Sequence, residues 1–139
     1  MTAIEDLPAA DRDLLAAARE ALDSAYVPYS EYRVGAALRT AEGAVFTGAN
    51  LENANYSNSL HAEEVALSGA RMAGHDAFDA VAVTSGERDG VTPCGMCRQT
   101  LAEFCDAEFR VLCDEGEAVA AYTLGELLPA AMGPATLGK

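Results

Sequence analysis

Two short motifs restrict the possible folds of this chain more than any other feature of its sequence. The first is His61-Ala62-Glu63, and the second, farther along the chain, is Pro93-Cys94-Gly95-Met96-Cys97. One imidazole and two thiolates form a ligand set typical of zinc, and three protein ligands leave the fourth tetrahedral position open for water, as in catalytic sites. The fold must therefore bring two distant segments together. Glu63 is the carboxylate expected to move protons to and from that water.

The spacing of the two cysteines suits the first turn of a helix. Cys94 and Cys97 are three residues apart, so both sulfurs lie on one side of such a turn, and Pro93 favours a helix start there. His61 also opens a predicted helix, so two positive helix ends are expected to converge on the metal. Spacing alone does not place Glu63 there, because residues i and i+2 of an ideal helix point roughly 200° apart.

A redox or purely structural role for the cysteines is less well supported. A lone C-x-x-C pair is compatible with a redox dithiol or with half of a structural zinc site, but the upstream H-x-E motif favours catalytic zinc. Cys105 and Cys113 could complete a four-thiolate site, yet their apolar surroundings are typical of buried thiols. His75 has no motif around it and is expected to be a solvated turn residue.

Length and composition fit one domain that covers residues 1–139, because half of the residues are hydrophobic and can form a core. No run of residues is apolar enough to span a bilayer, and the N-terminus lacks the layout of a signal peptide. A cytoplasmic protein without a membrane partner is expected.

The chain is strongly acidic, with 22 acidic against 9 basic residues and Lys139 as its only lysine. Nucleic-acid affinity comes largely from lysine and arginine contacts to phosphate, so a nucleic-acid partner is disfavoured. The net charge of −13 reflects either ordinary solubility or adaptation to a high-salt cytoplasm, where screening reduces self-repulsion.

Hydrophobic periodicity and capping signals predict alternating helices and strands. Helices are expected over 7–25, 60–73 and 94–105, with a short last helix opened by a capping box at 123–126, and strands over 33–40, 44–49, 80–85, 108–113 and 118–122. This alternation predicts an α/β fold, a three-layer α/β/α arrangement around a five-stranded mixed sheet. The polar stretch 50–59 would, by itself, be a surface loop.

The order H-x-E followed by P-C-x-x-C is the known signature of zinc-dependent nucleobase deaminases. More specifically, the chain resembles the short single-domain class of cytidine deaminases over nearly its whole length, through residues 26–30, 34–38, 50–56, 61–63, 93–99 and 126–129. The resemblance implies a cytidine-deaminase-like fold, one Zn²⁺ per subunit and a homotetramer that shares its active sites. It also implies a hydrolase of pyrimidine salvage, which deaminates cytidine and 2′-deoxycytidine to uridine and 2′-deoxyuridine plus ammonia.

The resemblance also implies roles for individual residues. His61, Cys94 and Cys97 would hold the zinc, and Glu63 would be catalytic, protonating N3 of the pyrimidine and then the departing ammonia. Asn50 and Glu52 would hold the sugar hydroxyls, which turns the polar loop into a clamp for a free nucleoside, not a nucleotide. The remaining substrate-binding residues are Tyr32, Tyr56 and Ala62, the last through its backbone.

Three positions depart from the family pattern. The short class often has cysteine at the position of His61 and arginine at that of Glu64, and an arginine would offset the charge of three thiolates. Met132 stands where the family commonly has a phenylalanine that stacks on the base from a neighbouring subunit. A methionine can also pack on a ring face.

Three other functions remain open. A related aminohydrolase could act on a pyrimidine-containing antibiotic such as blasticidin S, but it would leave the polar clamp of Asn50 and Glu52 unpaired. A polynucleotide-editing deaminase is opposed by the acidic surface. A non-catalytic zinc-binding module is opposed by the presence of Glu63.

Overall fold

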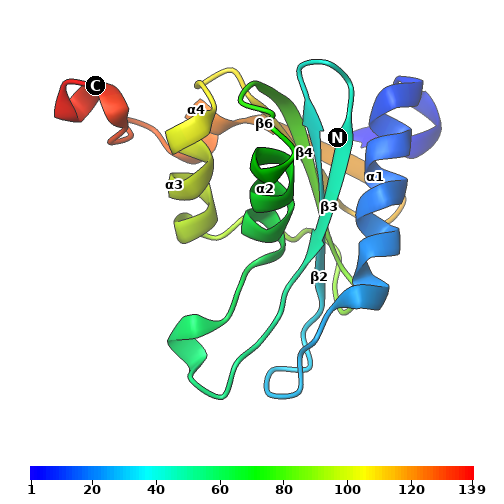
Figure 1. The fold of residues 1–139 in the computed structure, drawn as a ribbon. Coiled ribbons are helices and arrows are strands. Elements are labelled where there is room, and N and C mark those ends of the chain that lie inside the picture. The colour runs from blue at the N-terminus through cyan, green and yellow to red at the C-terminus, as the bar shows by residue number, and fades with distance from the viewer.

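The computed structural model describes residues 1–139 and is built on one mixed sheet with helices on both faces (Figure 1). The strand order is β1-β6-β5-β4-β2-β3. Strands β4 and β5 are parallel, whereas all other neighbours are antiparallel. The strands are β1 (Thr2–Ala3), β2 (Val34–Thr40), β3 (Val45–Ala49), β4 (Phe78–Ser85), β5 (Arg110–Asp114) and β6 (Ala118–Thr123). The helices are α1 (Ala9–Ala21), α2 (Ala62–Met72), α3 (Gly95–Phe104) and α4 (Leu124–Leu127).

The predicted α/β class and mixed sheet are confirmed, but the sheet has six strands where the sequence predicted five. The extra strand is β1, whose two residues pair with Val119 and Ala118 of β6. Two residues are too short to show the alternation from which a strand is recognised. The predicted capping box at α4 is present, because Thr123 Oγ1 accepts from the Glu126 amide at 3.2 Å and Glu126 Oε1 accepts from the Thr123 amide at 2.8 Å.

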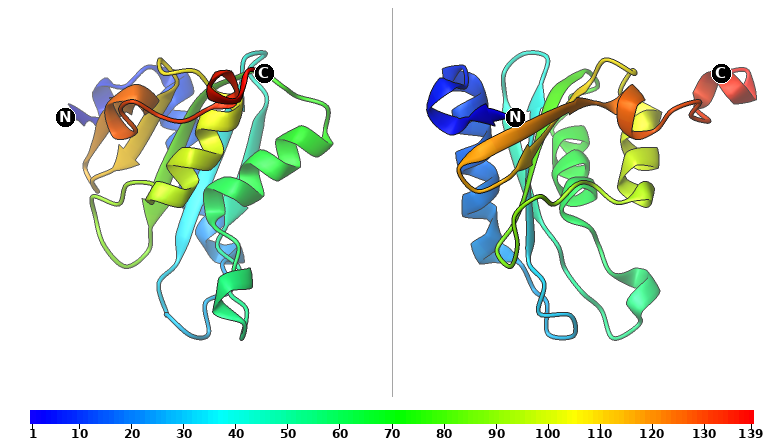
Figure 2. Two further views of the ribbon diagram at one scale, coloured as in Figure 1. Left: turned by 90° about the vertical axis from the view of Figure 1, so that its left-hand side faces the viewer. Right: turned by 180° about the vertical axis from the view of Figure 1, so that it is seen from behind.

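Helix α1 covers one face of the sheet, and α2 and α3 cover the other (Figures 1 and 2). Successive strand residues alternate between the two faces. Ala36, Leu38, Val81 and Val83 belong to the core under α2 and α3, whereas Ala37, Ala80, Ala82 and Leu112 belong to the core under α1. None of the helices has the length and apolar composition needed to cross a bilayer.

Two glycines let helices approach the sheet closely. A Cβ on Gly35 of β2 would lie 2.3 Å from the carbonyl oxygen of Ala18 in α1. A Cβ on Gly48 of β3 would lie 2.2 Å from the carbonyl oxygen of Ala62, the first residue of α2. The start of α2, which follows His61 directly, is therefore fixed against β3.

The C-terminal segment after α4 extends away from the sheet and ends in a 3-10 turn, Pro134–Leu137 (Figures 1 and 2). One side-chain hydrogen bond connects this segment to a helix: Gln99 Nε2 of α3 donates to the Met132 carbonyl oxygen at 2.8 Å. Met132 and Leu137 expose more than half of their surface.

Candidate functional site

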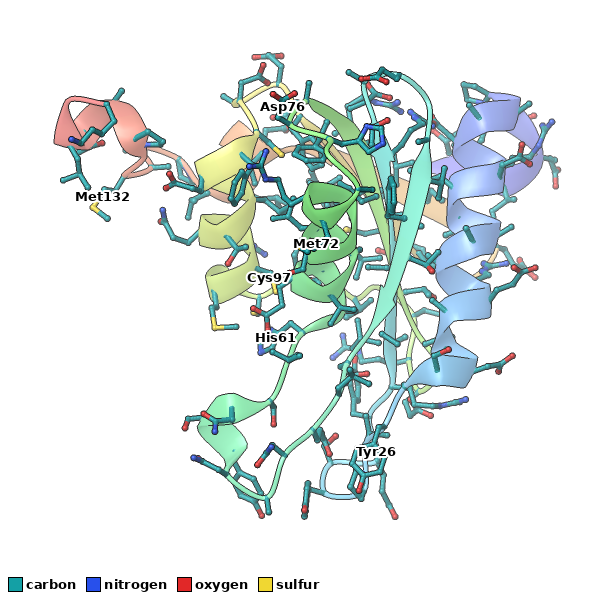
Figure 3. All side chains as sticks on the ribbon, in the orientation of Figure 1. Tyr26, His61, Met72, Asp76, Cys97 and Met132 are labelled. Atoms are coloured by element: carbon teal, nitrogen blue, oxygen red, sulfur yellow. The ribbon has the colours of Figure 1, made fainter.

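The starts of α2 and α3 meet on one side of the sheet and bring the two sequence motifs together. His61 immediately precedes α2, Cys94 immediately precedes α3, and Cys97 lies in the first turn of α3. His61 Nδ1 lies 3.2 Å from the sulfur of Cys97 and 3.3 Å from that of Cys94. Figure 3 shows His61 and Cys97 close together between the two helix starts.

This triad fits a zinc ion in both chemistry and size. The three ligand atoms lie within 4.8 Å of one another. Zinc with tetrahedral bonds of about 2.0 Å to nitrogen and about 2.3 Å to sulfur would separate these ligand atoms by roughly 3.5–3.8 Å. A small outward movement of the side chains would therefore admit the ion. Two sulfurs and one imidazole nitrogen also favour zinc over the hard cations magnesium and calcium.

The proton on Cys97 links metal binding to pH. Burial raises the pKa of the Cys97 thiol, and the neighbouring Glu63 carboxylate adds to the rise. The metal-free pocket therefore favours the protonated thiol, whereas zinc binds the thiolate. Because binding must release this proton, metal affinity is expected to fall as the pH falls.

Glu63 faces the same cavity as His61, although their spacing on an ideal helix would point them apart. His61 is not helical: it is the residue before the helix and is extended, with φ −89° and ψ 151°. The angular offset of helical residues therefore does not apply to this pair. The Glu63 side chain turns inward, and the residue is only 6% exposed.

The Glu63 carboxyl is poised to hold a proton. Burial raises its pKa, and the nearby Glu64 carboxylate raises it further. The Glu63 backbone amide, Cys97 and His61 act in the opposite direction, but burial prevails. A raised pKa makes the carboxylate a stronger base, which suits a group that must accept a proton and then give it up.

A cavity of about 240 Å³ lies over Glu63 and two of the three triad residues, His61 and Cys94. Three of the predicted substrate-binding residues, Tyr32, Asn50 and Ala62, line it together with His61, Glu63 and Cys94. Val34, Val91 and Thr92 complete the wall and were not predicted from the sequence. Thr92 stands next to the P-C-x-x-C motif, and this proximity was the one local signal for it.

Asn50 holds the wall of the cavity in place. Its Oδ1 accepts from the Val34 amide at 2.9 Å, and its Nδ2 donates to the Tyr32 carbonyl oxygen at 2.8 Å. A carboxamide has two donor hydrogens and two acceptor lone pairs. One donor hydrogen and one acceptor lone pair of Asn50 are therefore left for a ligand.

Glu52 and Tyr56 line a separate hollow of about 280 Å³, which also includes Tyr29, Ser30 and Ser59. Glu52 Oε1 accepts from the amides of Tyr29 and Ser30 at 3.0 and 3.1 Å. The Ser30 hydroxyl and these amides lower the pKa of Glu52, so its carboxylate is an ionised acceptor at neutral pH. Within one chain, these two predicted residues are therefore not in the cavity that holds His61.

The two other departures from the family pattern have distinct surroundings. Glu64 Oε1 accepts from the backbone amide of His61 at 2.6 Å, so this carboxylate fixes the residue that carries the imidazole. Met132 lies far from His61, on the C-terminal segment (Figure 3). It lines a groove of about 520 Å³ with residues of α3 and α4.

Comparison with known proteins gives one family. The model of the cytidine and deoxycytidylate deaminase zinc-binding region matches residues 8–113. A cytidine deaminase of Halalkalibacterium halodurans is 42% identical over 120 residues, which cover 85% of this chain and 90% of the relative. One from Mycobacterium tuberculosis is 38% identical over 116 residues and 84% of each chain. The crystal structure of a cytidine deaminase from Burkholderia pseudomallei has a TM-score of 0.82 at 40% identity, over 86% of this chain and 97% of that one.

Proposed function

The chain belongs to the family of zinc-binding cytidine and deoxycytidylate deaminases, and from this premise we propose how its residues deaminate cytidine and 2′-deoxycytidine. The observation that carries the mechanism is the buried Glu63 carboxyl in one cavity with His61 and Cys94. The reaction joins the oxygen of water to C4 of the pyrimidine and breaks the bond from C4 to the exocyclic nitrogen. The products are uridine or 2′-deoxyuridine and ammonia.

His61, Cys94 and Cys97 would hold the zinc, whose contribution when bound is to lower the pKa of water to about 7 and so supply a nucleophile at neutral pH. Glu63 takes one proton from the attacking water and gives it to N3 of the ring. It then takes the second proton and gives it to the amino group, which leaves as ammonia. A pKa raised by burial suits a carboxyl that carries two protons in succession.

Binding of a nucleoside would use both hollows. The cavity of about 240 Å³ is below the roughly 300–1,000 Å³ of most ligand pockets, which suits a single pyrimidine ring. The free donor and acceptor of Asn50 would hold the sugar, and the ionised Glu52 would accept from a sugar hydroxyl. A 5′-phosphate would gain no cation from Asn50 or Glu52, so nucleosides are the expected substrates. Tyr32 and the backbone of Ala62 would contact the base, and Tyr56 would close the sugar side.

The test is the fall in ultraviolet absorbance when the zinc-loaded protein is mixed with cytidine. Cytosine and cytidine monophosphate serve as controls for the sugar and for the phosphate. Glu63→Gln preserves the shape of the side chain but removes its proton transfer, so we expect full zinc content and a rate at least about 100-fold lower. Undiminished turnover by this variant would exclude the assigned role of Glu63.

We also propose that the enzyme is a homotetramer. Met72 of α2 and Phe104 of α3 expose 88% and 40% of their surface and line one surface hollow, where the Arg71 guanidinium lies over the Phe104 ring; Met96 of α3 exposes 50%. Such an apolar surface is a typical site of association between subunits. Sedimentation of the purified protein should give about four times the chain mass, and a species of 14.5 kDa at micromolar concentration would contradict this.

A further inference from the structure

Arg98, the residue after the proposed ligand Cys97, uses three nitrogens to join α3 to two other parts of the chain. Its Nε donates to the Pro93 carbonyl oxygen at 2.7 Å, and a terminal nitrogen donates to the Leu127 carbonyl oxygen at 2.8 Å. The other terminal nitrogen donates to Thr92 Oγ1 at 3.3 Å. The guanidinium therefore ties the segment before α3 to the end of α4.

Two of these acceptors adjoin the reaction cavity. Thr92 lines the cavity, and the fully buried Pro93 is joined directly to Cys94. Arg98 does not line the cavity itself. Its backbone amide donates to the Cys94 carbonyl oxygen at 2.9 Å, so the main chain and the side chain of Arg98 together bind residues 92–94. Whatever Arg98 contributes to the reaction must pass through these neighbours.

The third acceptor belongs to the last turn of α4. The final carbonyls of a helix have no partner within the helix, so the Leu127 carbonyl is free to accept from Arg98. The neighbouring Gln99 holds the Met132 carbonyl oxygen. Two successive residues of α3 thus connect the C-terminal part of the chain to the segment that carries Cys94.

We propose that Arg98 is a positioning residue, which sets the place of Thr92 and Cys94 relative to His61 by clamping residues 92–93 against the end of α4. A planar guanidinium presents its donors in a fixed fork, so one side chain can satisfy three acceptors that point in different directions. A lysine presents a single nitrogen and cannot reproduce this geometry. The relevance of Arg98 to deamination rests on the proposed function, whereas zinc affinity and hydrogen exchange can be measured without it.

The experiment compares wild type, Arg98→Ala and Arg98→Lys as full chains. Zinc affinity is measured by competition with a chromophoric chelator, and backbone exchange by hydrogen–deuterium mass spectrometry. We expect zinc affinity to fall about 10- to 100-fold in Arg98→Ala, the usual effect of removing a group that orients a metal ligand. The zinc affinity of Arg98→Lys should lie between those of wild type and Arg98→Ala. Exchange should rise at the amides of residues 98 and 128, which donate to the carbonyl oxygens of Cys94 and Leu124, but not in α1, on the opposite face of the sheet.

Rescue and a matched control distinguish positioning from simple loss of stability or charge. Millimolar methylguanidinium should restore part of the zinc affinity of Arg98→Ala. Arg88→Ala removes the same charge from an exposed residue of the nearby loop, whose one side-chain bond is to the adjacent Asp89 carbonyl. This control should bind zinc as wild type does.

Wild-type zinc affinity in Arg98→Ala would overturn the inference, and so would exchange that rises equally in α1. If Arg98→Ala does not fold, Arg98→Lys decides by the same two measurements. A wild-type protein that binds zinc but leaves cytidine unchanged would refute the proposed function alone, since affinity and exchange would still report on Arg98.

Discussion

Gly48→Ala tests whether the contact between β3 and α2 sets the geometry of the reaction cavity. The added Cβ would lie 2.2 Å from the Ala62 carbonyl oxygen and 2.6 Å from the Ala66 amide nitrogen. Both are backbone atoms, so no side chain can rotate to relieve the clash. Restoring an ordinary contact distance of 3.4 Å requires the start of α2 to move by about 1 Å.

This displacement would reach the chemistry directly, because His61 and Glu63 flank Ala62. Overpacking of this kind destabilises a fold by about 1–3 kcal/mol. A misplacement of about 1 Å at reacting groups can reduce the rate about 100-fold. We therefore expect Gly48→Ala to lower the free energy of unfolding, measured in urea, by about 1–3 kcal/mol. Its kcat/KM for cytidine at saturating zinc should fall about 100-fold.

Gly35→Ala is the matched control. Its Cβ would lie 2.3 Å from the Ala18 carbonyl oxygen, also a backbone atom, but in α1, which carries none of the candidate site residues. Gly35→Ala should be destabilised about as much and keep a kcat/KM within a few-fold of wild type. Equal losses of kcat/KM in both variants, or full activity in Gly48→Ala, would refute the reasoning.

Three further predictions concern acid, salt and the metal ligands. Burial alone would raise the pKa of Asp114, but hydrogen bonds from Arg19, the Gly116 amide and Thr84 outweigh it and lower the pKa below 3.8. The ionised Asp114 therefore stabilises the fold above pH 3.8, and this stabilisation is lost as the pH falls through the lower pKa that Asp114 has in the folded protein. Asp114→Asn should cost about 2–3 kcal/mol in urea unfolding at pH 7, with a difference that shrinks below pH 3.8; a constant difference would contradict this. The net charge of −13 predicts a higher melting temperature in molar KCl than in low salt, because screening weakens self-repulsion, and equal melting temperatures would count against salt adaptation. Finally, His61→Cys should lower cytidine turnover and the added Glu64→Arg should restore part of it, since an arginine offsets the charge of a third thiolate; a double variant no better than the single one would refute this compensation.

The secondary structure was largely predictable because its signals are local. The apolar run 80–85 and the capping box at Thr123 each lie within a few residues, and both predictions are confirmed. Strand β1 was missed because its two residues hold no pattern and are ordered only by their pairing with β6. The predicted helix ends differ by a few residues, as at α1, which begins after Pro8 and ends at Ala21.

The residues proposed to bind zinc could be chosen from side-chain chemistry, since few residue types can bind a soft metal and their spacing is regular. The inward direction of Glu63 was not, because it depends on the extended backbone of His61 and on the close contact of α2 with Gly48. The contribution of Val91 and Thr92 to the cavity wall could not be predicted either, because their side chains carry no distinctive chemistry.

The sequence by itself determined which atoms can bind metal and carry protons, since these are properties of single residues. Only the tertiary structure decided their mutual geometry: which side chains share the cavity of about 240 Å³, which lie in the neighbouring hollow, and how Arg98 connects the Cys94 segment to α4. The physical reason is that distances between segments far apart in the chain come from packing and hydrogen bonds across the fold, which no local pattern of residues contains.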